Sequence, residues 1–117
     1  MTPAMVFRQA ADHIEQPGGW TQGVFARDKD GDEVGAESTR AVCRCAAGAL
    51  QLVCGGNLID CDMATSVLAR AIYARAAVEY SDDYGPALDT VAYWNDAEGR
   101  TQAEVVAMLR KLAKVAA

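Results

Sequence analysis

The chain is poor in several kinds of residue, and each shortage excludes a class of protein. Its 117 residues include one histidine, three prolines and few aromatic side chains, and 11 basic residues stand against 16 acidic ones. The net charge of −5 argues against direct binding of nucleic-acid phosphates, because such binding relies on clustered Lys and Arg. No apolar run approaches the roughly 18 residues that a membrane-spanning helix needs, so no membrane association is expected.

We expect no secretory signal in the N-terminal stretch, since Arg8, Asp12 and Glu15 bring charge into it early. We therefore expect a cytoplasmic protein, in which stable disulfides are uncommon. Four cysteines lie close together in the sequence: Cys43, Cys45, Cys54 and Cys61. Their spacing, C-x-C-x8-C-x6-C, differs from the paired C-x2-C units of zinc ribbons. We interpret the cysteines as small buried apolar residues and predict no metal and no cofactor.

Alanine is the abundant residue. Hydrophobic residues make up 51% of the chain; 23 of them are Ala, and Leu, Ile, Val and Phe together contribute another 23. This composition indicates a helical domain in which small side chains let the helices pack closely. A single domain over residues 1–117 is expected, because a typical domain has about 150 residues and the chain shows no repeat or linker.

The first helix is expected to begin at Thr2-Pro3, since Thr is a good cap and Pro is favoured at the first helical position. Its apolar stripe consists of Phe7, Ala10, Ala11 and Ile14. Residues 20–27 show no helical stripe and predict a strand. A turn over residues 28–31 then leads into a short return strand at Glu33-Val34, so this region predicts a β-hairpin.

The next predicted helix, over residues 39–54, is apolar on nearly all sides, which is typical of a helix buried in the middle of a domain. Its polar and glycine stripe is expected to contain only Arg44, Gly48 and Gln51. Glycine costs about 1 kcal/mol relative to alanine inside a helix, so we expect a neighbouring element to approach Gly48 closely.

Three further helices are predicted over residues 62–79, 86–94 and 101–116. The first of these is capped by Asp60 or Asp62, and the last begins with a capping box formed by Thr101 and Glu104. The predicted fold is therefore mainly α: about five helices around a buried central helix, with a small β-hairpin after the first helix.

Cys45 is the sharpest candidate for chemistry. We expect it in the first turns of a helix beside Arg44, where the helix N-terminus and the cation would lower the pKa of the thiol. A nucleophilic cysteine also needs a base, and His13 is the only imidazole available, with Asn95 or Asp96 to orient it. The alternative, which the buried setting favours, is a structural Cys45 and a surface His13.

The acidic segment over residues 28–37 invites comparison with a calcium-binding loop. Ala26 would then occupy the first ligand position without offering a side-chain oxygen, and no helix precedes it. A solvated hairpin turn is the favoured interpretation.

A second candidate site contains Trp20, Trp94, Asn95 and Asp96. Buried tryptophan and asparagine side chains need hydrogen-bond partners. Asn95 or Asp96 could therefore cap a helix, tie a loop to the hairpin, or line a small pocket with Trp20; a structural role is favoured.

An acidic and aromatic segment follows the helix predicted over residues 62–79. It contains Tyr80, Asp82, Asp83 and Tyr84. Exposed tyrosines beside acids suit a basic partner surface, although a plain solvated loop is the simpler interpretation.

Several short motifs follow one another along the chain, each occurring once: Trp20-x-x-Gly23, Ala26-Arg27-Asp28 with Gly31, Cys45-x-x-Gly48-Ala49-Leu50, Trp94-Asn95-Asp96, Arg100-Thr101 and Glu104-Val105. In this pattern, from about residue 5 to 113, the chain resembles a family of small actinobacterial and phage proteins of unknown function. Members often carry Trp before the motif cysteine, where this chain has Arg44. The resemblance implies no activity, cofactor or catalytic residue.

The small size, the acidic balance and the incomplete catalytic set favour a non-enzymatic interaction protein of the kind that phages and mobile elements encode. It would bind a protein partner, for instance a host or defence component, through acidic surface at residues 28–37 or 80–84. The alternatives are a small cysteine-dependent enzyme using Cys45 with His13, and a small-ligand-binding domain with a pocket near Trp20 and Trp94. The sequence is also compatible with a homo-oligomer, because Ala-rich helices pack between chains as well as within one. The expected binding residues are Trp20, Arg44, Trp94, Asn95, Asp96, Tyr80, Asp82, Asp83 and Tyr84.

Overall fold

Helices dominate the computed structural model, which describes residues 1–76 and 84–116. The five helices are α1 (Pro3–Glu15), α2 (Ala46–Cys54), α3 (Leu58–Ala76), α4 (Tyr84–Asp96) and α5 (Gln102–Val115). Three two-residue strands lie between α1 and α2: β1 (Ala26–Arg27), β2 (Glu33–Val34) and β3 (Cys43–Arg44). The mainly α fold with a small β unit after the first helix is confirmed. No helix in the described residues is both long and apolar enough to cross a membrane.

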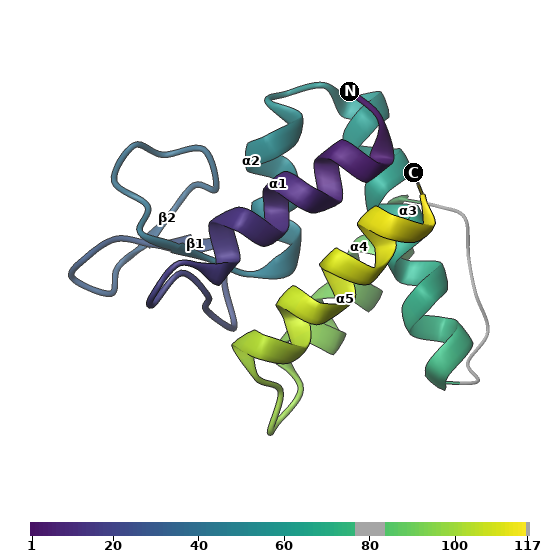
Figure 1. The fold of residues 1–117 in the computed structure, drawn as a ribbon. Coiled ribbons are helices and arrows are strands. Elements are labelled where there is room, and N and C mark those ends of the chain that lie inside the picture. Colours follow the sequence, from purple (N-terminus) through teal and green to yellow (C-terminus); the bar gives the residue numbers. More distant parts are fainter. Residues whose placement is uncertain (77–83, 117) are drawn as a thin grey trace.

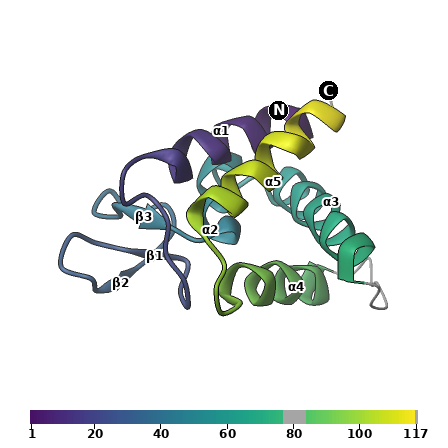
Figure 2. The same cartoon turned by 60° about the horizontal axis from the view of Figure 1, so that its bottom comes forward.

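Helix α2 is the central helix that the sequence predicts. It packs against α1, α3, α4 and strand β3, and Figure 2 shows it lying beneath α1 and above α4. Leu50 and the alanines of its first turns are fully or almost fully buried. The apolar nature of nearly every side of this helix is therefore explained by neighbours in several directions.

The two ends of the chain lie side by side, because α1 and α5 run antiparallel across one face (Figure 1). The predicted stripe of α1 is buried, and so are Val105, Met108, Leu109 and Leu112 of α5. Thr2 caps α1, and the capping box between Thr101 and Glu104 is present at the start of α5, as predicted. Arg110 of α5 pairs with Asp12 and Glu15 of α1.

The predicted strand over residues 20–27 is wrong except at its end. Only Ala26 and Arg27 form a strand, which is the middle strand of an antiparallel sheet ordered β2-β1-β3. Residues 22–25 bend instead, and Gly23 adopts a left-handed φ of 86°. The third strand, β3, was not predicted, because Cys43 fits the apolar stripe and Arg44 the polar stripe expected for the following helix.

The central helix begins at Ala46, not at residue 39, and Arg44 does not belong to its polar stripe. The backbone N–H groups of Arg44 and Cys45 donate to the carbonyls of Gly19 and Phe25, so these residues are held extended. Helix α3 begins at Leu58 rather than residue 62, because the side chain of Asn57 accepts from the N–H of Asp60. Neither Asp60 nor Asp62 caps this helix, and the predicted end of α3 lies outside the described residues.

Gly48 meets the close approach that its sequence position predicts. A Cβ placed there would lie 2.2 Å from the carbonyl oxygen of Phe25, just before β1. The bare backbone of Gly48 therefore lets the sheet and the central helix approach one another.

Candidate binding site

Asn95 is fully buried near the end of α4, and its side chain uses its full hydrogen-bonding capacity. Its Oδ1 accepts from the indole Nε1 of Trp20 at 2.8 Å and from the backbone N of Ala46 at 3.0 Å. Its Nδ2 donates to the carbonyl of Thr21 at 3.1 Å and to Oδ1 of Asp96 at 3.0 Å. Asn95 thus joins α4, the start of α2 and the chain after α1.

Neighbouring groups extend this connection along the bent segment. Oδ1 of Asp96 also accepts from the backbone N of Gly23 at 2.9 Å. Nε2 of Gln22 donates to the carbonyls of Asn95 and Ala97, at 3.0 and 3.2 Å. Trp20 forms an isolated parallel bridge with Arg44, whereas residues 22–23 lie in a bend, and these bonds fix that bend against the end of α4.

A cavity of about 180 Å³ opens beside this network, and we name it the Cys45 cavity. Its lining residues are Gly23, Val24, Phe25, Glu33, Cys45, Ala92 and Asp96. The carboxylates of Glu33 and Asp96 belong to exposed residues on β2 and α4, whereas the remaining wall is mostly apolar. This combination suits a ligand that carries a positive charge on an apolar stem.

The thiol of Cys45 has a capping role. Cys45 is the N-cap of α2, where its Sγ accepts from the N–H of Gly48 at 3.3 Å. Burial raises the pKa of this thiol, and the nearby Asp96 raises it further. The expectation of a lowered pKa is therefore wrong, because desolvation outweighs the hydrogen bonds from the backbone of Gly48 and Ala47 at the helix N-terminus.

The other members of the proposed thiol arrangement are placed as follows. His13 is exposed on α1, and its side chain makes no hydrogen bond to any described residue. Arg44, on β3, donates from Nε to the carbonyl of Ala36 at 2.8 Å. Asn95 and Asp96 bond to the Trp20–Gly23 segment, and not to the imidazole.

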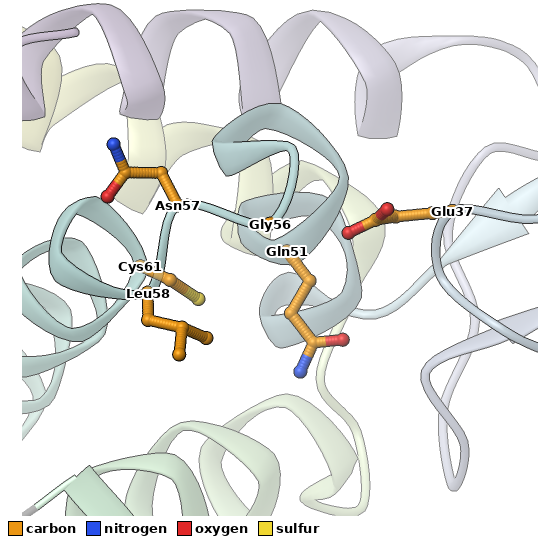
Figure 3. A pocket seen from close by; sticks show the side chains of 6 residues that line it. All are labelled: Glu37, Gln51, Gly56, Asn57, Leu58 and Cys61. Carbon is orange, nitrogen blue, oxygen red and sulfur yellow. The ribbon is translucent and has the colours of Figure 1, made fainter.

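A second cavity, of about 220 Å³, lies where α2 meets α3, and we name it the α2–α3 cavity (Figure 3). It is lined by Glu37, Gln51, Gly56, Asn57, Leu58 and Cys61. In Figure 3 the carboxylate of Glu37 points toward α2, and the side chains of Leu58 and Gln51 extend on the same side of the ribbon. Leu58 and Ile59 are 75% and 72% exposed, and Met63, one turn after Ile59, is 51% exposed.

Comparison with family models identifies the chain at the level of a family. The model of a family of unknown function, DUF6197, matches residues 1–115. The chain belongs to the DUF6197 family. Neither the curated proteins nor the solved structures contain a significant match. The predicted resemblance to a family of unknown function is thereby confirmed at that level.

The acidic segment of this DUF6197 chain, residues 28–37, contributes to a turn and to the walls of two cavities. Oδ1 of Asp28 accepts from the backbone N–H groups of Asp30 and Asp32, which closes the turn between β1 and β2. Glu33 lines the Cys45 cavity and Glu37 the α2–α3 cavity. Within the described residues, no three His, Cys, Asp or Glu side chains converge as a metal site would require.

Of the aromatic acidic segment, Tyr80, Asp82, Asp83 and the side chain of Tyr84 lie outside the described residues. Sequence reasoning also missed the exposed residues Leu58 and Ile59. The helix start predicted at residue 62 left both of them in a loop, whereas α3 begins at Leu58.

Proposed function

We propose that this DUF6197 protein is a non-enzymatic protein-binding domain whose docking surface is the first turns of α3. The main support is that Leu58 and Ile59, adjacent in sequence, are each more than 70% exposed beside the α2–α3 cavity. Together with Met63 they form what we name the α3 apolar surface. Single exposed apolar residues are ordinary, whereas grouped ones next to a concavity favour a protein partner.

The charges around this surface define the chemistry of the partner. Glu37 lines the adjoining cavity, Asp62 is exposed on α3, and the whole chain has a net charge of −5. Complementarity therefore favours a segment that presents apolar side chains together with Lys or Arg, such as a basic amphipathic helix. Of the acidic segment over residues 28–37, which the sequence predicts to bind the partner, only Glu37 belongs to the proposed docking surface. The resemblance to phage proteins favours a partner from a host or its defences.

Selection from a random peptide display library tests the proposal. Wild-type protein should enrich peptides that combine apolar residues with Lys or Arg, and Leu58→Ser/Ile59→Ser should lose their binding. The fold should tolerate this double substitution, since exposed positions usually change stability by about 0.5 kcal/mol or less. Tyr93→Ser is the matched control, because Tyr93 is 79% exposed on α4 and should be dispensable.

Equal enrichment on the wild-type and the Leu58→Ser/Ile59→Ser proteins would contradict the proposal, and so would the selection of acidic peptides. For a selected peptide, Glu37→Gln should weaken binding, and the loss should shrink at high salt, where charge interactions are screened.

A second candidate function, binding of a small organic cation, is supported by the Cys45 cavity. Glu33 and Asp96 offer two carboxylates next to the apolar wall formed in part by Phe25. An alkylguanidinium such as agmatine should raise the melting temperature of the wild type and leave that of Glu33→Gln unchanged. Glu37→Gln, which alters the other cavity, should respond like the wild type.

A further inference from the structure

A third cavity lies where the end of α4, the following turn and α5 meet. It has a volume of about 230 Å³ and is lined by Trp94, Arg100, Glu104, Ala107, Met108 and Lys111. The four α5 residues have the i, i+3, i+4, i+7 spacing of one helical face. Neither the proposed docking surface nor the cation candidate uses this cavity, which we name the Arg100 cavity.

The guanidinium of Arg100 is held in place by three contacts. Its Nε donates to the carbonyl of Trp94 at 2.8 Å, and its Cζ lies 4.6 Å from the centroid of the Trp94 ring. Its Nη1 pairs with Oε2 of Glu104 at 3.1 Å. The third nitrogen, Nη2, makes no hydrogen bond to a described residue. Arg100 is therefore ordered before a ligand binds, so binding would cost little further side-chain entropy at this donor.

The one carboxylate in the wall is largely compensated. Oε1 of Glu104 accepts from the backbone N and the hydroxyl of Thr101, at 3.1 and 3.2 Å, within the capping box. Oε2 is bound to Arg100. The bond from the Thr101 backbone, above all, lowers the pKa of Glu104 and keeps it ionised. Its negative charge faces the N-terminus of α5 and Arg100, so it balances only one of the two cations.

Two further donors in the wall, the ammonium of Lys111 and the indole N–H of Trp94, have no acceptor among the described residues. Lys111 is exposed and forms no ion pair with a described residue. The indole N–H of Trp94 donates no hydrogen bond to a described residue, and it is not completely buried, because no unpaired polar side-chain atom in the described residues is. Ammonium, guanidinium and indole N–H groups together form a donor set that recognises an oxyanion.

We propose that the Arg100 cavity binds the carboxylate or phosphate group of a small organic molecule, whose apolar part rests on Ala107 and Met108. The guanidinium of Arg100 and the ammonium of Lys111 would meet the anion, with Arg100 fixed by Trp94 and Lys111 closing on the ligand. The chain as a whole is acidic, so attraction to the anion comes from these local groups and not from the net charge.

Two probes with the same ring distinguish the two anions: benzoate and phenyl phosphate, titrated into the full-length ¹⁵N-labelled protein at constant ionic strength. At least one should shift the indole N–H resonance of Trp94 saturably; Trp94→Phe identifies that resonance by removing it. Lys111→Gln should weaken binding at least tenfold. Lys114→Gln removes the same charge from the same helix outside the cavity wall, and should weaken binding no more than twofold.

Whichever probe binds more tightly identifies the preferred group, and either result supports the site. Absence of saturable shifts with both probes would overturn the proposal. So would neutral benzamide binding as tightly as benzoate, or equal losses in Lys111→Gln and Lys114→Gln. The spectra of both variants also report whether the fold is retained, so a loss of binding can be separated from unfolding.

Discussion

Asn95 makes four hydrogen bonds from a fully buried position, and two of them serve groups that have no other described partner. The indole N–H of Trp20 and the first backbone N–H of α2, that of Ala46, both donate to the same oxygen. A buried donor left unpaired costs about 1–3 kcal/mol. The side chain therefore contributes more through the groups that it satisfies than through its own burial.

Asn95→Asp tests this role with almost no change of shape. The acceptor for Trp20 and Ala46 is kept, but the donor becomes an oxygen that faces the carbonyl of Thr21 and Oδ1 of Asp96. We expect a loss of about 3–5 kcal/mol in the free energy of unfolding at neutral pH, because a buried charge stands next to two acceptors. Urea titrations measure it. Part of the loss should return at a pH low enough to protonate the introduced carboxyl.

Asp96→Asn is the matched control, since Asp96 is exposed and the change keeps an oxygen that can accept from Gly23. We expect it to lower stability by less than about 1 kcal/mol. Equal effects of the two substitutions would show that Asn95 is not the centre of the network.

The thiol of Cys45 should react slowly in the folded protein. Because burial raises its pKa, a smaller thiolate fraction is present near neutral pH than for a free cysteine, and the thiolate is the reactive form. Alkylation by iodoacetamide, mapped by mass spectrometry, should be at least tenfold slower at Cys45 than in urea-unfolded protein. Rapid labelling of Cys45 in the folded protein at pH 7, lost in Cys45→Ser, would instead favour the cysteine-enzyme hypothesis.

The same raised pKa has a consequence for stability at alkaline pH. The unfolded chain ionises its Cys45 thiol before the folded protein does, so this group favours unfolding once the pH exceeds the ordinary range of a cysteine pKa. Cys45→Ser should therefore flatten the decline of stability above that range.

At the scale of elements, the contact between α2 and the chain before β1 sets the position of the candidate site. The carbonyl of Phe25 accepts from the N–H of Cys45 and lies against the backbone of Gly48. The sheet thus packs on the first turn of α2, which brings Cys45 and Glu33 into the wall of one cavity.

Gly48→Ala should destabilise the protein although alanine is the better helix former. The gain in helix propensity is about 1 kcal/mol, but a Cβ at 2.2 Å from the Phe25 oxygen forces backbone to move. We expect a net loss of about 1–3 kcal/mol, as for other overpacked sites, measured by urea denaturation. Gly35→Ala is the control, since a Cβ there meets nothing within 4 Å; a similar loss in both variants would contradict the explanation.

At the scale of the whole molecule, the first and last helices hold the two ends of the chain together. Nε2 of Gln102, at the start of α5, donates to the carbonyls of Ile14 and Gln16 at the end of α1. Two turns farther along α5, Arg110 bonds to Asp12 and Glu15 in the last turn of α1. Between these polar contacts lie fully buried apolar residues, so stability here depends on a few large side chains packed among alanines.

Leu109→Ala measures that dependence. Leu109 is fully buried, and removing its branched end should cost about 2–5 kcal/mol because closely packed helices collapse poorly around a cavity. Val115→Ala on the same helix should change stability by about 0.5 kcal/mol or less, since Val115 is 73% exposed. Thermal unfolding of both variants checks this; a small loss for Leu109→Ala would indicate that the contact between α1 and α5 is loosely packed.

Features that depend on neighbours along the chain could be predicted. The cap at Thr2, the capping box at Thr101 and the buried stripe of α1 follow from side-chain spacing of three or four residues, which a helix brings onto one face. The tight approach at Gly48 was also predictable, because a glycine in an otherwise apolar helix requires a reason. Periodicity failed at residues 43–44, where the stripes expected for the following helix extend over a strand.

Short-range spacing thus specified the helices, the place of the β unit and the buried central helix, since those depend on which side chains share a face. The candidate sites were decided by tertiary structure alone. Trp20 and Asn95 are 75 residues apart in sequence, and Glu37 and Leu58 line one cavity only because the sheet packs on α2 and α3 follows it. The direction of the shift in the Cys45 pKa was decided there too, because burial, which no local pattern reports, outweighs the backbone hydrogen bonds of the helix terminus.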